Sequence, residues 1–146
     1  MANWYGTARS NYVRLKDPEA VKQLLADRAS DVSLQESSSA PGLFVFLVNG
    51  MSDSGGWPSV CPLTAEGEED YDADPIGFDD LIAEHLVDGE VLILIEAGAE
   101  KLRYVTGQAH ALRVKNGKRQ DLVVSIDDIY ALVEKRWKVK PTEAVY

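Results

Sequence analysis

Apolar residues recur along the chain with two spacings, one typical of helices and one typical of strands. From Phe78 onward they fall at positions i, i+3, i+4, i+7 and i+8, and Gly89 is a natural stop. Asp17-Pro18-Glu19 predicts the start of another helix over about 18–29, because the aspartate can cap it and proline fits its first turn. A third helix is expected over about 128–138. Its expected inward-facing residues are Ile129, Leu132, Val133 and Trp137.

Short apolar runs between these segments predict strands. Two strand-like segments flank Asn116-Gly117, the commonest short hairpin turn signal. If that turn has two residues, Ala109 faces Val124 and Ala111 faces Leu122. This face sets small side chains against large ones, so we expect it to turn toward the core. The other expected strands lie within 2–16, near 32–36, and over Leu43–Val48 and Val91–Ile95.

The predicted order of elements is β-α-β-β-loop-α-β-β-β-α. Hairpin signals dominate this order, which favours an α+β fold with a mainly antiparallel sheet and about three helices. A length of 146 residues fits one domain over 1–146, interrupted by a long acidic loop at about 49–76.

Composition narrows the class of protein. The chain is 45% hydrophobic and 27% charged, within the ordinary globular range. No apolar run approaches the length of a membrane span, and the first residues lack the order of a signal peptide. The single cysteine, Cys61, excludes an internal disulfide, so we expect a reducing cytoplasm. A net charge of −9 argues against direct binding to nucleic acid or to an anionic membrane.

The charge is strongly segregated along the chain. No Lys or Arg occurs between Arg28 and Lys101, and this gap holds 16 of the 24 Asp and Glu residues. Such segregation is typical of proteins whose electrostatic field steers a partner. A cluster of basic residues at the hairpin tip is expected to protect a sheet edge. The alternatives are that it neutralises the acidic segment in the fold or forms a second contact with a partner. The cluster comprises Arg113, Lys115, Lys118 and Arg119.

The densest acidic run, residues 66–80, places 8 carboxylates in 15 residues. Asp70, Asp72 and Asp74 match the first ligand positions of a calcium loop. Pro75 then replaces the required glycine, and Leu81 replaces the bidentate glutamate. We therefore predict no metal ion and no cofactor.

Two interpretations of the acidic run remain. It is either a solvated loop that keeps the protein soluble, or a surface that imitates a phosphate track and binds a basic protein surface. Trp57 lies in a Gly-Gly-Trp-Pro loop, where it either pins the loop to the core or anchors a partner. The candidate partner-binding residues are Glu66, Glu68, Glu69, Asp70, Asp72, Asp74, Asp79, Asp80, Glu84 and Trp57.

A small-molecule-binding or enzymatic domain is the alternative from another class. Its pocket would lie between the sheet and the loop Gly55–Pro62, and would use Trp57, Tyr104, Arg9 or His110. Cys61 with His85 or His110 has the residue types of a thiol nucleophile and its base, but no family signature surrounds the cysteine. We therefore predict no catalytic residue.

Three segments stand out by their sequence: Asn3–Tyr12 (NWYGTARSNY), Gly98–Tyr104 and Ser125–Tyr130. They resemble a family of small uncharacterised proteins of phages and plasmids. The resemblance implies no activity, but it implies the setting of a mobile element in a host cytoplasm. Small acidic proteins of such elements often occupy the nucleic-acid sites of restriction or CRISPR effectors. The expected partner is therefore a host defence nuclease, and an immunity protein for a basic toxin is a further alternative with the same charge logic.

Overall fold

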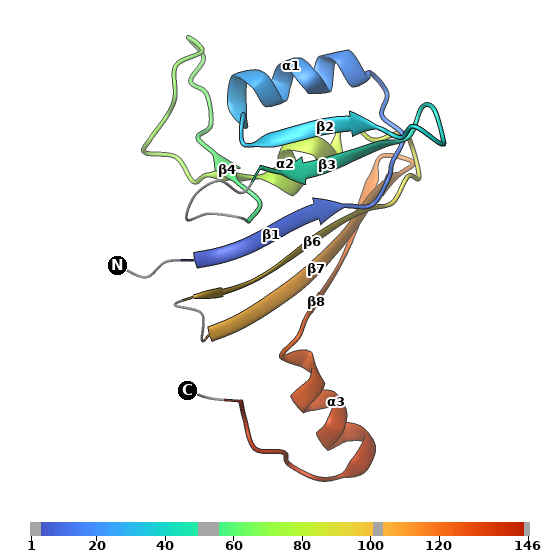
Figure 1. Cartoon of the computed structure of the whole chain (residues 1–146). Helices are drawn as coiled ribbons and strands as arrows, with labels where there is room; N and C mark the ends of the chain where they lie inside the picture. The colour runs from blue at the N-terminus through green and yellow to red at the C-terminus, as the bar shows by residue number, and fades with distance from the viewer. Residues whose placement is uncertain (1–3, 50–55, 101–103, 145–146) are drawn as a thin grey trace.

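The structure, a computed structural model, describes residues 4–49, 56–100 and 104–144 and shows an α+β fold (Figure 1). Six antiparallel strands form the main sheet in the order β2-β3-β1-β6-β7-β8. They are β1 (Trp4–Ser10), β2 (Val32–Glu36), β3 (Phe44–Val48), β6 (Leu92–Glu100), β7 (Tyr104–Lys115) and β8 (Lys118–Ser125). A small second sheet pairs β4 (Ser59–Val60) with β5 (Ile76–Gly77). The helices are α1 (Pro18–Arg28), α2 (Phe78–Ala83) and α3 (Asp128–Trp137).

The α+β class, the antiparallel sheet and the three helices confirm the prediction from the sequence. Helix α1 begins where predicted, because the Asp17 carboxylate accepts a hydrogen bond from the backbone N–H of Ala20 at 3.1 Å. Helix α2 is shorter than the helical pattern indicates. The chain leaves it so that Leu86 can pair with Leu15, and the backbone N–H of Lys16 donates to the carbonyl of His85 at 2.9 Å.

One face of the main sheet carries the core. Helices α1 and α2 pack there, and Leu92, Leu94 and Leu112 from the sheet join Ile82 of α2 and Val21 of α1 in one buried cluster. Because side chains alternate along a strand, the residues between these core positions point to the opposite face. We call this opposite side of β1, β6, β7 and β8 the open face, since no described helix covers it.

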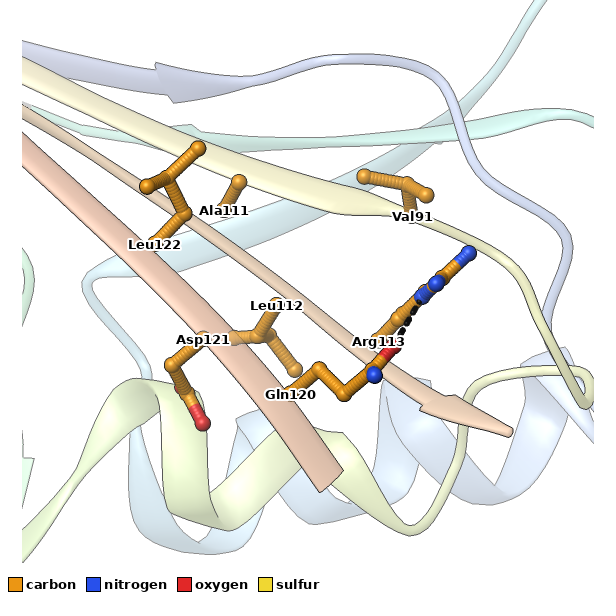
Figure 2. A pocket seen from close by; sticks show the side chains of 7 residues that line it. All are labelled: Val91, Ala111, Leu112, Arg113, Gln120, Asp121 and Leu122. Carbon is orange, nitrogen blue, oxygen red and sulfur yellow. Dashed lines mark hydrogen bonds between the residues drawn. The ribbon is translucent and has the colours of Figure 1, made fainter. Parts of the chain in front are cut away.

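The hairpin β7–β8 has the predicted register but the opposite orientation. Ala109 pairs with Val124 and Ala111 with Leu122, as the two-residue turn requires. The sequence-based prediction that this face turns to the core is wrong, because Leu122 is 67% exposed, whereas Leu112 is 1% exposed. Figure 2 shows Ala111 and Leu122 on one side of the hairpin and Leu112 on the other.

Helix α3 also differs from its predicted packing. None of its residues is buried, so the expected inward stripe does not face the core of this chain. The helix ends at Trp137, where Lys138 adopts a left-handed conformation with a φ of 59°. None of the helices in the described residues is long and apolar enough to cross a membrane.

The two faces of the hairpin predict different effects of matched Leu→Ala substitutions. Leu112→Ala removes a fully buried side chain and should lower the free energy of unfolding by about 2–5 kcal/mol. Leu122→Ala removes an exposed side chain and should lower it by about 1 kcal/mol or less. Urea unfolding of both variants checks this, and a larger loss for Leu122→Ala would place the core on the other face.

Candidate functional site

The acidic loop between β4 and α2 is ordered by a tight turn. The backbone N–H of Gly67 donates to the carbonyl of Thr64 at 2.9 Å, and the N–H of Thr64 donates to the carbonyl of Glu68 at 2.8 Å. Gly67 has a φ of 85°, which glycine adopts without steric cost. The turn holds the backbone while Glu66 and Glu68 stay exposed.

The predicted partner-binding residues divide by their contacts. Some carboxylates bind their own loop, since Asp70 accepts a hydrogen bond from the N–H of Asp72 at 3.1 Å and Glu69 accepts one from the hydroxyl of Tyr71. The bond to Glu69 raises the pKa of Tyr71. Four other predicted partner-binding carboxylates form no ion pair with a Lys or Arg in the described part of the chain. We call these four the acidic patch; they are Glu66, Glu68, Asp72 and Asp74, and all are exposed.

Arg119 on β8 joins three carboxylates. Its Nη2 lies 2.6 Å from Oδ2 of Asp79, its Nη1 binds Asp80, and its Nε lies 3.0 Å from Oδ2 of Asp121. His110 lies beside them, with Nε2 at 2.7 Å from Asp121 and Nδ1 at 3.8 Å from Asp79. We call these five residues the Arg119 cluster.

The Arg119 cluster changes the interpretation of two predicted sites. Asp79 and Asp80 were expected to bind a partner, but in the fold Arg119 pairs with both. Arg119 therefore counters the acidic segment, as one alternative interpretation of the basic hairpin tip proposed, while it also lies on the edge strand β8. Gly77 helps to shape this contact, because a Cβ there would lie 2.5 Å from Oδ1 of Asp79.

Contacts within the Arg119 cluster shift the pKa values of Asp121 and Arg119. The hydrogen bonds from Arg119, followed by the bond to His110, hold the pKa of the Asp121 carboxyl below its ordinary value. The pKa of Arg119 is raised in turn, first by Asp121 and then by Asp79 and Asp80. The guanidinium is therefore the counter-ion that these carboxylates share.

The same cluster contains the one group of potential metal ligands that converges among the described residues. One ligand atom each from Asp79, His110 and Asp121 lies within 4.8 Å of the others. The guanidinium of Arg119 already binds both carboxylates, so a divalent cation would have to displace it. We therefore identify Arg119 as the counter-ion of the Asp79 and Asp121 carboxylates. The calcium-like spacing of Asp70, Asp72 and Asp74 produces no such convergence in the described residues.

A small cavity of about 200 Å³ lies beside the cluster. Its wall includes Trp57, whose ring stacks on Phe78 with centroids 4.9 Å apart, so the tryptophan pins its loop to the core. Glu96 accepts hydrogen bonds from the backbone N–H of Trp57 at 3.1 Å and from the amide of Gln108 at 2.7 Å. The indole Nε1 of Trp57 is buried without a partner in the described residues. His110 completes the polar side of the wall.

The cavity gathers part of the residue set that the sequence proposed for a pocket. Trp57 and His110 line it together, whereas Arg9 pairs with Ile95 and lies on the open face. Gly55 and the side chain of Tyr104 lie outside the described residues. Cys61 does not line this cavity, and its carbonyl accepts a hydrogen bond from Arg28.

The functional residues predicted from the sequence did not include Asp121 of the Arg119 cluster, nor Glu96 and Gln108 of the cavity. The signal for Asp121 was present in the hairpin register, which places it opposite Leu112 and one diagonal step from His110. Glu96 and Gln108 are direct partners across β6 and β7, but no turn signal fixes the register of those strands.

Replacing Arg119 should release the pKa of Asp121. In Arg119→Met the pKa of Asp121 should rise toward its ordinary value of about 3.9, as NMR titration of the carboxyl would show. Lys118→Met, one residue earlier and exposed, is the control and should leave that pKa unchanged.

The same variant should alter the dependence of stability on pH. A carboxyl with a lowered folded-state pKa stabilises the fold above its unfolded pKa, and that contribution is lost as pH falls through the folded value. The free energy of unfolding of the wild type should therefore fall below about pH 4, and Arg119→Met should fall less steeply there. Equal slopes in the two proteins would contradict this assignment.

Searches of the chain against protein-family models, curated proteins and solved structures return no match. No activity, ligand or partner is therefore carried over from another protein.

Proposed function

We propose that this chain is a non-enzymatic binding protein whose acidic patch docks on a basic surface of another protein. The observation that carries the proposal is the contrast between two sets of carboxylates. Asp79 and Asp80 are paired with Arg119, whereas the acidic patch is exposed and has no ion pair within the described residues. Clustered like charges disfavour the compact state through self-repulsion, and a partner's Lys and Arg would relieve that repulsion.

The docking surface is narrower than the sequence indicated. It consists of the acidic patch, flanked by Glu69 and Asp70, which already accept hydrogen bonds within their loop. Glu84, the residue that follows α2, is exposed, and its carboxylate lies 3.6 Å from Nε2 of His85. Trp57 stacks on Phe78 and supports the loop from beneath, so it is not part of the docking surface.

The chemistry of the patch fits a groove that normally holds a phosphate backbone. Lys and Arg in such a groove respond to charge and spacing, whichever anionic group supplies them. A host defence nuclease, such as a restriction enzyme or CRISPR effector in the cytoplasm, provides such a groove and agrees with the resemblance to proteins of mobile elements. A basic toxin would use the same charges, so the partner assay decides between an inhibitor and an immunity protein.

Removing the acidic patch should abolish inhibition of the partner. The variant combines Glu66→Gln, Glu68→Gln, Asp72→Asn and Asp74→Asn. Inhibition of DNA binding is measured on a panel of purified defence nucleases and basic nuclease toxins. The affinity of the wild type should fall about 10-fold or more between roughly 50 and 300 mM salt, and the variant should lose both the affinity and this salt dependence.

A matched control removes four exposed carboxylates elsewhere, by Glu19→Gln, Asp27→Asn, Asp31→Asn and Glu143→Gln. It makes the net charge less negative by the same amount and should leave inhibition unchanged. Equal effects of the two variants would show that only net charge matters, and no inhibition by the wild type across the panel would count against the proposal.

The cavity beside the Arg119 cluster favours a second candidate, the binding of a small polar ligand. The cavity wall carries the carboxylate of Glu96, the amide of Gln108 and the imidazole of His110. A ligand with a hydrogen-bond donor and a carbonyl oxygen would gain affinity by pairing with these polar groups. The volume of about 200 Å³ limits it to a fragment.

A fragment screen by NMR tests the cavity. Carbonyl-bearing fragments should shift the Trp57 indole N–H resonance together with the imidazole of His110, and should leave Trp137 unaffected. Gln108→Leu changes one polar group of the wall and should weaken the fragments without changing DNA-binding inhibition. Shifts spread over all the tryptophans, or no shifts at Trp57, would exclude a ligand site there.

A further inference from the structure

The open face carries an apolar patch, bordered by polar residues of β1, β7 and β8. On it lie Tyr5 of β1, Ile95 of β6, and Leu122 and Val124 of β8, each about half exposed or more. Ala109 and Ala111 lie between them on β7. Single exposed apolar residues are ordinary, but a contiguous patch of this kind marks an interaction surface.

Helix α3 presents a second unpartnered apolar surface. Ile129, Leu132, Val133 and Trp137 recur at helical spacing, and Leu132 and Trp137 are 58% and 69% exposed. A cavity of about 520 Å³ along this stripe is lined by residues of α3 alone. Figure 1 shows α3 beyond the end of the strands, away from both other helices.

The connection between β8 and α3 keeps the helix off its own open face. The backbone N–H of Ile126 donates to the carbonyl of Gly107 at 2.9 Å, and that of Ser125 donates to the carboxylate of Asp128 at 2.7 Å. Gly107 permits this close approach, because a Cβ there would lie 3.2 Å from Cγ2 of Ile126. These two hydrogen bonds hold the start of α3 at the end of β8.

We propose that a second copy of this chain covers both surfaces, with α3 of each copy packed on the open face of the other. The chain supplies both halves of the contact, which is the condition for a closed two-fold interface. A hollow of about 260 Å³ is lined by Val91, Ala111 and Leu122 together with the polar side chains of Arg113 and Gln120 (Figure 2). In the dimer, Trp137 of the second copy would fill it. An aromatic side chain in such a hollow is the usual anchor of an interface.

The available area matches the area that a stable dimer needs. Eight large apolar side chains, each about half exposed, leave on the order of 100 Å² apiece, or about 800 Å² per copy, which is the contribution of one partner to a standard interface. They are Tyr5, Val91, Ile95, Leu122, Val124, Ile129, Leu132 and Trp137. Pairing through the edge of β8 is the weaker alternative, because Lys118, Arg119 and Asp121 place charges along that edge.

The oligomeric state of the full chain tests the proposal. Sedimentation equilibrium should give a dimer for the wild type. Leu122→Lys on the open face and Leu132→Lys on α3 should each weaken it by about 10-fold or more. Leu63→Lys is the control, since Leu63 is 48% exposed but lies in the acidic loop, and it should leave the dimer intact. Both interface residues are already exposed, so circular dichroism should show both variants folded.

An isotope-filtered NOE experiment on a mixture of labelled and unlabelled protein tests the geometry. The indole of Trp137 in one copy should give cross-peaks to methyl groups of Leu122 or Val124 in the other. A wild type that is monomeric at its highest soluble concentration would overturn the proposal. So would a dimer insensitive to both Lys substitutions, or a monomer that floats with anionic lipid vesicles, which would assign α3 to a membrane surface. These readouts do not depend on any partner of the acidic patch.

Discussion

One-sided burial of the six-stranded sheet is the constraint on which the rest of the structure depends. Helices α1 and α2 have 11 and 6 residues, and both join the cluster that contains Leu92 and Leu112. Because side chains alternate along each strand, burying these leucines turns every intervening residue to the open face. The register of β7 and β8 therefore places apolar residues on the open face. No described helix covers them, because α3 is held beyond the end of the strands.

The hairpin that carries this register also decides where the negative charge remains. Along the sequence, Arg119 lies 40 residues from Asp79, outside the segment that lacks basic residues. In the fold β8 passes beside α2, so Arg119 pairs with the carboxylates at the start of that helix. Partly exposed ion pairs contribute little stability individually, but a shared guanidinium fixes the geometry of three carboxylates. The acidic patch receives no such partner within the described residues.

Local signals in the sequence were sufficient to predict the helices and strands and the pairing register of β7 with β8. Asp17 and Pro18 determine the start of α1, and Asn116-Gly117 determines the pairing of β7 with β8. The buried face of the hairpin was not predictable in this way, because both of its faces carry apolar residues. Leu112 turns inward because it meets Leu92 and Ile82, which are distant in sequence. The contact of Arg119 with Asp79 is equally non-local, and only the diagonal step between His110 and Asp121 was open to prediction.

The two proposed surfaces do not compete for space. Figure 1 shows the acidic loop and α3 at opposite ends of the molecule. A dimer joined through α3 would carry two acidic patches, each far from the interface, and their mutual repulsion would be screened beyond a Debye length of about 8 Å in physiological salt. Two patches on one particle raise the effective concentration of the second once the first has bound, provided the partner presents two basic grooves at a matching distance. A symmetric partner that binds each patch weakly would then be held more strongly by the dimer than by a single chain. The apolar open face would in this way set the strength of an interaction in which it takes no direct part.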